Sequence, residues 1–366
     1  MSKIAYRFYF NSRSFLWRFS MKKWILIIFG VACILFSGCS NQFVKESSFR
    51  RSGSAKEGNA KKKSISLVCW NVQTFFDAVT VGTEYKDFKN SERWNKEKYL
   101  KRLNKLCDVM TSLNPDIFVM EEIENTEVVQ DIANALAGSS WEHKKNWQYA
   151  CFAKECGSAI GCAVFSRYEL SSLKCHSIDI RTQAEEQPSS RPLMQLTVCI
   201  GNKELELFVN HWKSKSGGEE ETEIWRDWQE LVLAEKIISE LSSQKNSEKT
   251  VVMCGDFNRS AEAFILSKSD KNHSNTLLRG YSGSAAVYSP WFRPDGKFTA
   301  EAGSYFYNDE WERIDNILIS GEGTITSFSA VTDSPVADEE GIPLPYKVYT
   351  GEGCSDHLPL KCVITI

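Results

Sequence analysis

The sequence lacks several features that mark common classes of protein. None of its 12 cysteines forms a CxxC pair, and no Cys/His cluster has the spacing of a zinc site. There is no internal repeat, and no apolar run reaches the roughly 20 residues of a membrane-spanning helix. With 366 residues, 42% of them hydrophobic and 25% charged, the chain is too long and apolar for a disordered, collagen-like or miniprotein class.

The chain also lacks an overall excess of basic residues, because its formal net charge is −3. That value hides an uneven distribution: residues 1–63 carry a net charge of +11, and residues 64–366 carry −14. Proteins that bind nucleic acids tightly usually present a basic surface. The acidic body therefore gives no such indication by its overall charge.

The basic N-terminal segment resembles a bacterial export signal. Met21-Lys22-Lys23 is followed by the thirteen uncharged residues Trp24 to Phe36, and Leu35 to Cys39 resembles a lipobox that ends in a lipidated cysteine. We therefore expect a signal peptide over residues 1–39, with Met21 as an alternative natural start, and a flexible basic tether over residues 40–63. The expected location is the bacterial cell envelope, as a lipoprotein on the periplasmic or cell-surface side held by an N-terminal acyl anchor. The alternatives are an uncleaved anchor and a secreted protein.

The body, residues 64–366, mixes strand patterns with amphipathic helices. Two helices are expected, one from the apolar spacing of Tyr99, Leu103, Leu106, Met110 and Leu113, and one over Trp225 to Leu241. Strands come both alternately with helices and in consecutive pairs, which predicts an α/β fold of two mixed sheets flanked by helices. Residues 270–310 and 332–354 are expected to be long loops. The strands are predicted at Ile65–Val72, Ile117–Met120, Ile160–Phe165, Leu193–Ile200, Leu205–Val209, Val251–Cys254, Ile314–Ile319 and Leu358–Ile366.

Acids, amides and histidines stand at the ends of these strands. Carboxylates that cluster at one sheet edge repel each other unless a divalent cation lies among them, and Mg²⁺ or Mn²⁺ prefers oxygen ligands. Such a cation is usually completed by phosphate oxygens, which favours hydrolysis of a phosphate ester. The residues in question are Asn71, Glu121-Glu122, Asn210-His211, Gly255-Asp256-Phe257-Asn258, Asp315 and Ser355-Asp356-His357.

The same segments, in the same order along nearly the whole body, resemble the endonuclease/exonuclease/phosphatase superfamily. Trp70-Asn71-Val72-Gln73-Thr74-Phe75-Phe76-Asp77 is similar to the opening motif of exported bacterial members, although Gln73-Thr74 replaces the family's Glu-Asn. The resemblance implies a four-layer α/β/β/α sandwich and a metal-dependent phosphodiester hydrolase. The segment Asn210-His211-Trp212-Lys213-Ser214-Lys215 is similar to a stretch of secreted nucleases.

The resemblance also implies roles for single residues. Glu122 would be the principal ligand of Mg²⁺ or Mn²⁺, with Asn71 in the same network. Asp256 would orient or deprotonate the attacking water, and Asn258 would stabilise the transition state. His357, oriented by Asp356 or Asp315, and His211 would contact the scissile phosphate. Asn210, Lys213 and Lys215 are expected to bind substrate, and for the two lysines a solvated surface position is an equal alternative.

The expected substrate is DNA or RNA, hydrolysed by an exported nuclease that we expect to be monomeric. A phosphatase or a phospholipid phosphodiesterase of the same superfamily is the alternative, since the acidic body lacks an overall basic surface. A surface binding protein without activity is a third possibility, which the intact Glu122, Asp256, Asn258 and His357 disfavour.

Overall fold

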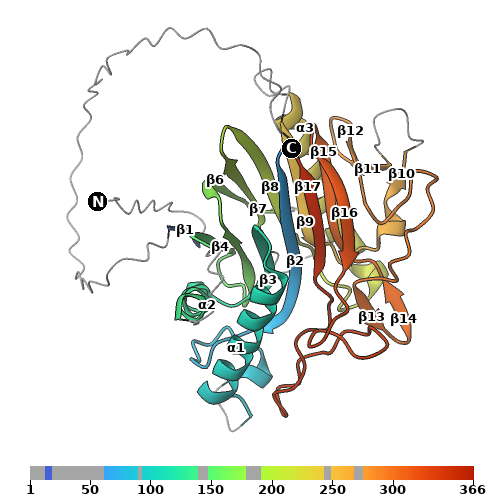
Figure 1. The fold of residues 1–366 in the computed structure, drawn as a ribbon. Coiled ribbons are helices and arrows are strands. Elements are labelled where there is room, and N and C mark those ends of the chain that lie inside the picture. The colour runs from blue at the N-terminus through green and yellow to red at the C-terminus, as the bar shows by residue number, and fades with distance from the viewer. Residues whose placement is uncertain are drawn as a thin grey trace, which may run out of the picture. The chain divides into compact units, whose positions relative to one another are not determined.

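Two large β-sheets lie face to face in the computed structural model, which describes residues 13–18, 62–89, 93–138, 147–178, 191–242, 249–267 and 275–366 (Figure 1). The first sheet has seven strands in the order β1-β4-β5-β3-β2-β17-β16. Only β2 and β3 in it run parallel. Its strands are β1 (Arg13–Arg18), β2 (Ser64–Phe75), β3 (Ile117–Ile123), β4 (Tyr149–Lys154), β5 (Gly161–Ser166), β16 (Thr324–Ala330) and β17 (Leu360–Thr365).

The second sheet has five strands in the order β15-β9-β8-β7-β6, and only β8 and β9 are parallel. A three-stranded sheet and a two-stranded hairpin complete the β-structure. The five strands are β6 (Glu169–His176), β7 (Leu193–Ile200), β8 (Lys203–His211), β9 (Thr250–Asp256) and β15 (Asp315–Gly321). The smaller sheets contain β10 (Ile265–Leu266), β11 (Thr276–Arg279) and β12 (Ser284–Val287), and β13 (Tyr305–Tyr307) and β14 (Glu310–Glu312).

In the residues that the structure describes, three α-helices cover the outer faces of the two sheets. These are α1 (Lys96–Leu113), α2 (Thr126–Gly138) and α3 (Glu219–Ser242), and short 3₁₀ helices occur at η1 (Lys86–Phe88) and η2 (Ala261–Ala263). Residues of α1 and α2 share one hydrophobic core with the outer face of the seven-stranded sheet, and α3 shares another with the five-stranded sheet. A third core, which contains Leu67, Val119, Leu196 and Ile317, fills the space between the sheets. The predicted α/β/β/α sandwich with two mixed sheets is therefore confirmed.

The sequence patterns missed some elements. Helix α2 and strands β4, β6 and β16 were not predicted, and residues 270–310, expected as a loop, contain β11, β12 and β13. Asn114 caps helix α1 directly after Leu113 with a left-handed backbone (φ 47°), one residue before Pro115. The predicted lipobox and nearly all of the predicted tether lie outside the described residues, so both stay predictions. In the part of the chain that is described, no helix combines the length and apolar character needed to cross a membrane.

Each large sheet contains one parallel pair joined by a helix. Helix α1 connects β2 to β3, and α3 connects β8 to β9. The carboxyl ends of parallel strands meet at one edge, so each crossover gathers the residues that follow two strands. The polar residues predicted at strand ends are thereby brought to adjacent edges of the two sheets.

Candidate active site

Strand register brings the polar residues of each sheet together. In the seven-stranded sheet Asn71 is paired with Glu121, and in the five-stranded sheet Asp256 is paired with both His211 and Asp315. All five are buried. Because the burial of so many polar groups is unfavourable unless each has a partner or a ligand, this cluster is a strong candidate for a functional site.

A β-bulge decides which of two adjacent glutamates faces the site. The pairing of β3 with β5 shifts between Glu121 and Ile123, and Glu122 adopts a left-handed backbone with φ 66°. The Glu122 carboxylate consequently accepts hydrogen bonds from the Thr74 backbone N–H and, at 3.4 Å, from Asn71 Nδ2. Glu121 instead points into the space between the sheets, where it accepts a hydrogen bond from the Cys69 thiol.

The segment that binds Glu122 is itself strained and held by a buried arginine. Gln73 and Thr74 have φ values of 51° and 46°, a region that non-glycine residues rarely occupy. The Arg102 guanidinium donates to the carbonyls of Val72, Gln73 and Thr74. Its face also lies 3.8 Å from the ring centroid of Tyr346. Helix α1 thus fixes the backbone that positions Glu122.

Asp256 lies at the centre of the hydrogen-bond network. Its Oδ2 accepts from Asn71 Nδ2 at 3.1 Å and from Asn258 Nδ2 at 3.0 Å, and its Oδ1 accepts from the Asn258 backbone N–H at 2.8 Å. Asn258 has a left-handed backbone (φ 45°) that turns its amide back toward Asp256. Burial and the charge of Asp315 raise the pKa of Asp256 to about 7.

His357 and Asp315 form a buried pair. His357 Nδ1 lies 2.8 Å from Asp315 Oδ2, whereas His357 Nε2 is 4.0 Å from Asp356 Oδ1, so Asp315 is the residue that orients the ring. Burial opposes protonation of His357, but the charge and hydrogen bond of Asp315, followed by Asp356 and Asp256, raise its pKa well above the usual value. The segment that carries His357 is attached to β2, because Trp70 Nε1 donates a hydrogen bond to the His357 carbonyl at 2.8 Å.

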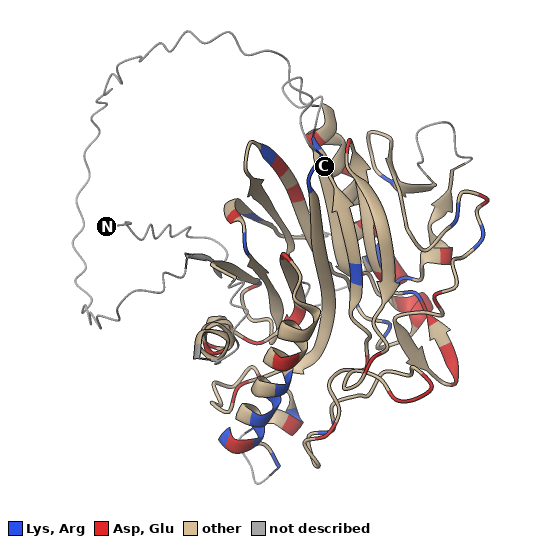
Figure 2. Cartoon of the chain, in the orientation of Figure 1, with Lys and Arg blue, Asp and Glu red and all other residues tan. Residues whose placement is uncertain are grey.

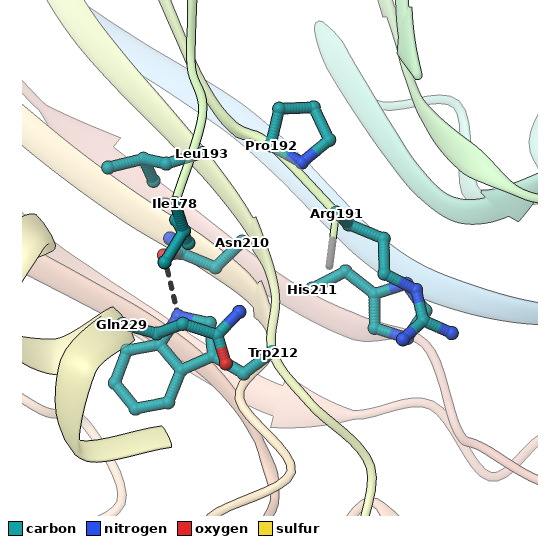
Figure 3. Close-up of a pocket in the computed structure, with 8 residues that line it drawn as sticks. All are labelled: Ile178, Arg191, Pro192, Leu193, Asn210, His211, Trp212 and Gln229. Carbon is teal, nitrogen blue, oxygen red and sulfur yellow. Dashed lines mark hydrogen bonds between the residues drawn. The ribbon is translucent and has the colours of Figure 1, made fainter. Parts of the chain in front are cut away.

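The second histidine has the opposite electrostatic environment. His211 Nε2 lies 3.6 Å from Glu122 Oε1 and 3.8 Å from Asp256 Oδ2. Burial, followed by the charges of Arg191 and His357, lowers the pKa of His211 well below its usual value. Figure 3 shows the Arg191 side chain beside the His211 ring, at a small pocket that both residues line. A neutral His211 and a cationic His357 therefore flank the same carboxylates.

One glycine allows the two parallel strands to approach at the site. Gly255 has φ 134°, and a Cβ added to it would lie 1.9 Å from the backbone oxygen of Asn210. Any larger residue would push β9 away from β8 at Asn210, the position next to the pairing of His211 with Asp256. Asn210 itself points inward and accepts a hydrogen bond from Trp212 Nε1 at 3.0 Å.

The donor set fits a divalent cation. Burial and neighbouring carboxylates raise the pKa values of Glu121 and Glu122, with Asp315 the main neighbour of the first and Asp356 of the second. This is the pattern of carboxylates that lack a counter-ion. Asp256, Asp315 and His357 each place one ligand atom within 4.8 Å of the others, and Asn71 Nδ2 donates to both Glu122 and Asp256. Asn71, expected as a ligand, turns Nδ2 toward the carboxylates and Oδ1 toward the Gln73 N–H.

The two predicted substrate lysines are engaged in local contacts. Lys215 Nζ pairs with Glu312 at 2.7 Å and with Glu219 at 2.9 Å, and Lys213 Nζ donates to the carbonyls of Ser214 and Ser216. Neither ammonium group makes a contact with the carboxylate cluster in the described residues. Their role in substrate binding, like that of Asn210, stays a prediction.

Several residues of the site were not predicted. Arg102 lies on the apolar face of α1, where no sequence pattern distinguishes it from an ordinary surface base. Ser355 belongs to the predicted Ser-Asp-His segment, and its Oγ donates to the Asn71 carbonyl at 2.6 Å and accepts from the His357 N–H. Tyr305 contacts the His357 ring, with ring centroids 4.8 Å apart. Ser355 and Tyr305 lie in sequence segments that could have revealed them, Ser355-Asp356-His357 and Gly303-Ser304-Tyr305-Phe306-Tyr307.

Comparison with known proteins agrees with this architecture. The model of the Endonuclease/Exonuclease/phosphatase family matches residues 66–342, which is more than half of the chain. No curated protein sequence matches the chain.

Several solved structures share the fold at low sequence identity. TDP2 from Caenorhabditis elegans is 14% identical with a TM-score of 0.53, and the match covers 83% of this chain and 75% of that one. TDP2 from D. rerio, complexed with a single-strand DNA product, is 16% identical with a TM-score of 0.50, covering 82% and 98%. An endonuclease/exonuclease/phosphatase family protein from Bacteroides thetaiotaomicron is 12% identical with a TM-score of 0.50, covering 84% and 99%.

Proposed function

The chain belongs to the endonuclease/exonuclease/phosphatase family, whose enzymes hydrolyse phosphate esters and generally depend on a divalent metal, and we propose that it is an exported nuclease. One observation carries this proposal: Glu122, His211, Asp256 and the Asp315–His357 pair converge at one place from both sheets. The D. rerio TDP2 complex shows that a protein of this fold can bind a single strand of DNA. A nucleic-acid substrate is therefore compatible with the fold.

The residues suggest a division of work in phosphodiester hydrolysis. A divalent cation held by Glu122 and Asp256 would supply positive charge next to the phosphate oxygens. Asp256, whose carboxylate Asn258 holds in place, would accept the proton of the attacking water. His357, kept cationic by Asp315, donates a hydrogen bond to the developing negative charge. His211, kept neutral by burial, contacts the phosphate from the opposite side.

A substrate panel tests the proposal. The full-length chain is incubated with single-stranded DNA, duplex DNA and RNA in Mg²⁺ or Mn²⁺, and again in EDTA. We expect hydrolysis with metal only, and a loss of at least about 100-fold in the His357→Ala variant, in line with removal of a hydrogen-bond donor to the transition state. Undiminished activity in that variant would show that this site is not responsible.

The charges around the site favour a second candidate function, a phosphatase or a phospholipid phosphodiesterase. Lys215 is paired with Glu219 and Glu312, and acidic residues are seen on β14 (Figure 2). A long polyanion gains little from such a surface, whereas a small phosphate ester or a phospholipid headgroup is less affected. The panel accordingly includes sugar phosphates, inositol phosphates and sphingomyelin. Turnover of one of these without cleavage of DNA or RNA favours the phosphatase or phospholipid phosphodiesterase.

The proposed location is the bacterial cell envelope, reached as a lipoprotein through Cys39. This proposal depends on the sequence from Trp24 to Cys39 alone. Incorporation of a labelled fatty acid into the expressed chain, and its loss in Cys39→Ala, are the expected results. Release of an unlabelled mature protein cleaved at another position would instead indicate a secreted enzyme.

A further inference from the structure

A row of aromatic rings leads from His357 to the surface. The Tyr305 ring centroid lies 4.8 Å from that of His357, and the Tyr307 ring lies beyond it, 6.2 Å from Tyr305 and nearly parallel to it at 17°. Tyr307 is 57% exposed, while Tyr305 is half-buried. The row therefore begins at the candidate catalytic ring and ends in a ring whose surface is open.

The hairpin that carries the two tyrosines is fixed to the site. Strands β13 and β14 are joined at Asn308 and Asp309, whose φ values of 49° and 63° fit the tight turn typical of a two-residue hairpin. Tyr305 pairs with His357 across an isolated bridge, and the Leu358 N–H donates to the Ser304 carbonyl at 2.7 Å. The backbone that carries the two rings is thus held in place before any ligand binds, which reduces the entropy cost of binding.

Alternation along the strand places Tyr305 and Tyr307 on one side of the hairpin. Phe306 faces the other way and packs edge-on against Trp311, with centroids 5.1 Å apart. Burial, followed by the charges of Asp356, Glu312 and Asp256, raises the pKa of Tyr305 to about 12, which is consistent with a hydroxyl near the carboxylates of the site. The face with the two tyrosines is therefore the one next to the reacting groups.

The charges beside the rings favour an uncharged planar group. Glu312 is paired with Tyr305 across the hairpin and Glu310 with Tyr307. Lys215 neutralises Glu312, whereas Glu310 is exposed at the tip beside Asp309. A further phosphate placed over the rings would be repelled by these carboxylates. A nucleobase would not be repelled, because it is neutral, and its flat π-face can stack on the rings.

We propose that Tyr305 and Tyr307 form a stacking subsite for the nucleobase attached to the scissile phosphate, and that the substrate is single-stranded or a strand end. In a duplex both faces of a base are covered by its neighbours, so only an unstacked base can lie on Tyr307. This inference rests on the proposed function, because it assumes that the phosphate at His357 belongs to a nucleotide.

The test uses a dinucleotide with a single phosphodiester bond and two analogues that each lack one base. For the intact dinucleotide, Tyr307→Ala should lower kcat/KM by about 5- to 150-fold, the range for loss of one base–aromatic contact. Tyr307→Phe should retain nearly all of the wild-type kcat/KM. For the analogue that lacks the stacked base, wild-type activity should already be low and Tyr307→Ala should change it less than about twofold. Tyr281→Ala removes a comparably exposed tyrosine (65%) of the β11–β12 hairpin and should have no effect.

Three results would overturn the inference while leaving the proposed function intact. They are an equal loss in Tyr307→Ala for substrates with and without the base, the same loss in Tyr281→Ala, and faster cleavage of a 20-base-pair duplex than of its separated strands. If no phosphodiester is hydrolysed, the proposed function fails separately, and binding of a fluorescent single strand in EDTA still decides the subsite. The subsite is supported if Tyr307→Ala binds that strand more weakly than wild type does but binds a strand of abasic residues equally well. Unchanged binding of the strand with bases refutes the subsite.

Discussion

The buried Arg102 offers the sharpest test of how the fold supports the site. Its side chain, 3% exposed, donates to three successive backbone carbonyls at the end of β2 and lies between the rings of Phe75 and Tyr346. Burial lowers the pKa of Arg102 to about 10, so the group is still charged at neutral pH. The perturbation is Arg102→Met, which keeps a long apolar stem and removes every donor.

The expected loss of stability follows from the three carbonyls. A buried acceptor left without its donor costs about 1–3 kcal/mol, and the carbonyls of Gln73 and Thr74 are near enough to the surface for water to replace part of this. We expect the free energy of unfolding to fall by about 3–5 kcal/mol. Arg102→Lys keeps the charge but not the planar fork, so it should lose about half as much.

The assay is equilibrium unfolding in urea, followed by tryptophan fluorescence. With a slope of about 3 kcal/mol/M, the midpoint for Arg102→Met should fall by about 1–1.7 M. Arg293→Met is the matched control, because Arg293 is 53% exposed and its ion pair with Asp295, at 3.4 Å, lies at the surface. Its loss should cost less than about 0.5 kcal/mol. A midpoint for Arg102→Met that falls by less than about 0.3 M would refute the reasoning.

Three further predictions concern the site itself. In Asp315→Asn the pKa of His357 should fall, so the alkaline limb of the pH–kcat profile should move to lower pH; an unmoved limb would exclude a protonated His357. Gly255→Ala should lower the free energy of unfolding by about 2 kcal/mol more than Gly296→Ala does, because Gly296 also has a positive φ (77°) but has open space where a Cβ would lie. Equal effects of the two substitutions on thermal unfolding would contradict the close contact at Gly255. Glu122→Gln should raise the Mg²⁺ concentration for half-maximal activity at least about tenfold without lowering the melting temperature in EDTA, since it removes carboxylate repulsion; an unchanged metal requirement would argue against Glu122 as a ligand.

The strand-end residues were predictable because parallel crossovers follow from the alternation of strands and helices. Once β2–α1–β3 and β8–α3–β9 are recognised, Asn71, Glu122, His211 and Asp256 must lie at sheet edges. Helix α2 was also within reach, since Asn125 caps it through a hydrogen bond from the Val128 N–H to its Oδ1.

Other features depend on contacts that no local pattern encodes. Strict alternation in β3 does not distinguish Glu121 from Glu122, because the bulge at Glu122 is a property of three paired strands. The burial of Arg102 depends on carbonyls contributed by β2, about 30 residues away. Lys215, for which substrate binding and a surface position were equal alternatives, pairs with Glu312, which lies 97 positions later in the chain. Long-range partners of this kind appear only in the folded structure.

The pairing of β17 with β2 has a consequence for when the enzyme becomes active. These strands, Leu360–Thr365 and Ser64–Phe75, lie at opposite ends of the catalytic body in sequence, and the residues just before β17 carry His357. A nascent or partly translocated chain can already contain Glu122, His211 and Asp256, yet it lacks the cationic ring that Trp70 and Asp315 hold in place. Hydrolytic activity can therefore begin only after synthesis of this body is complete.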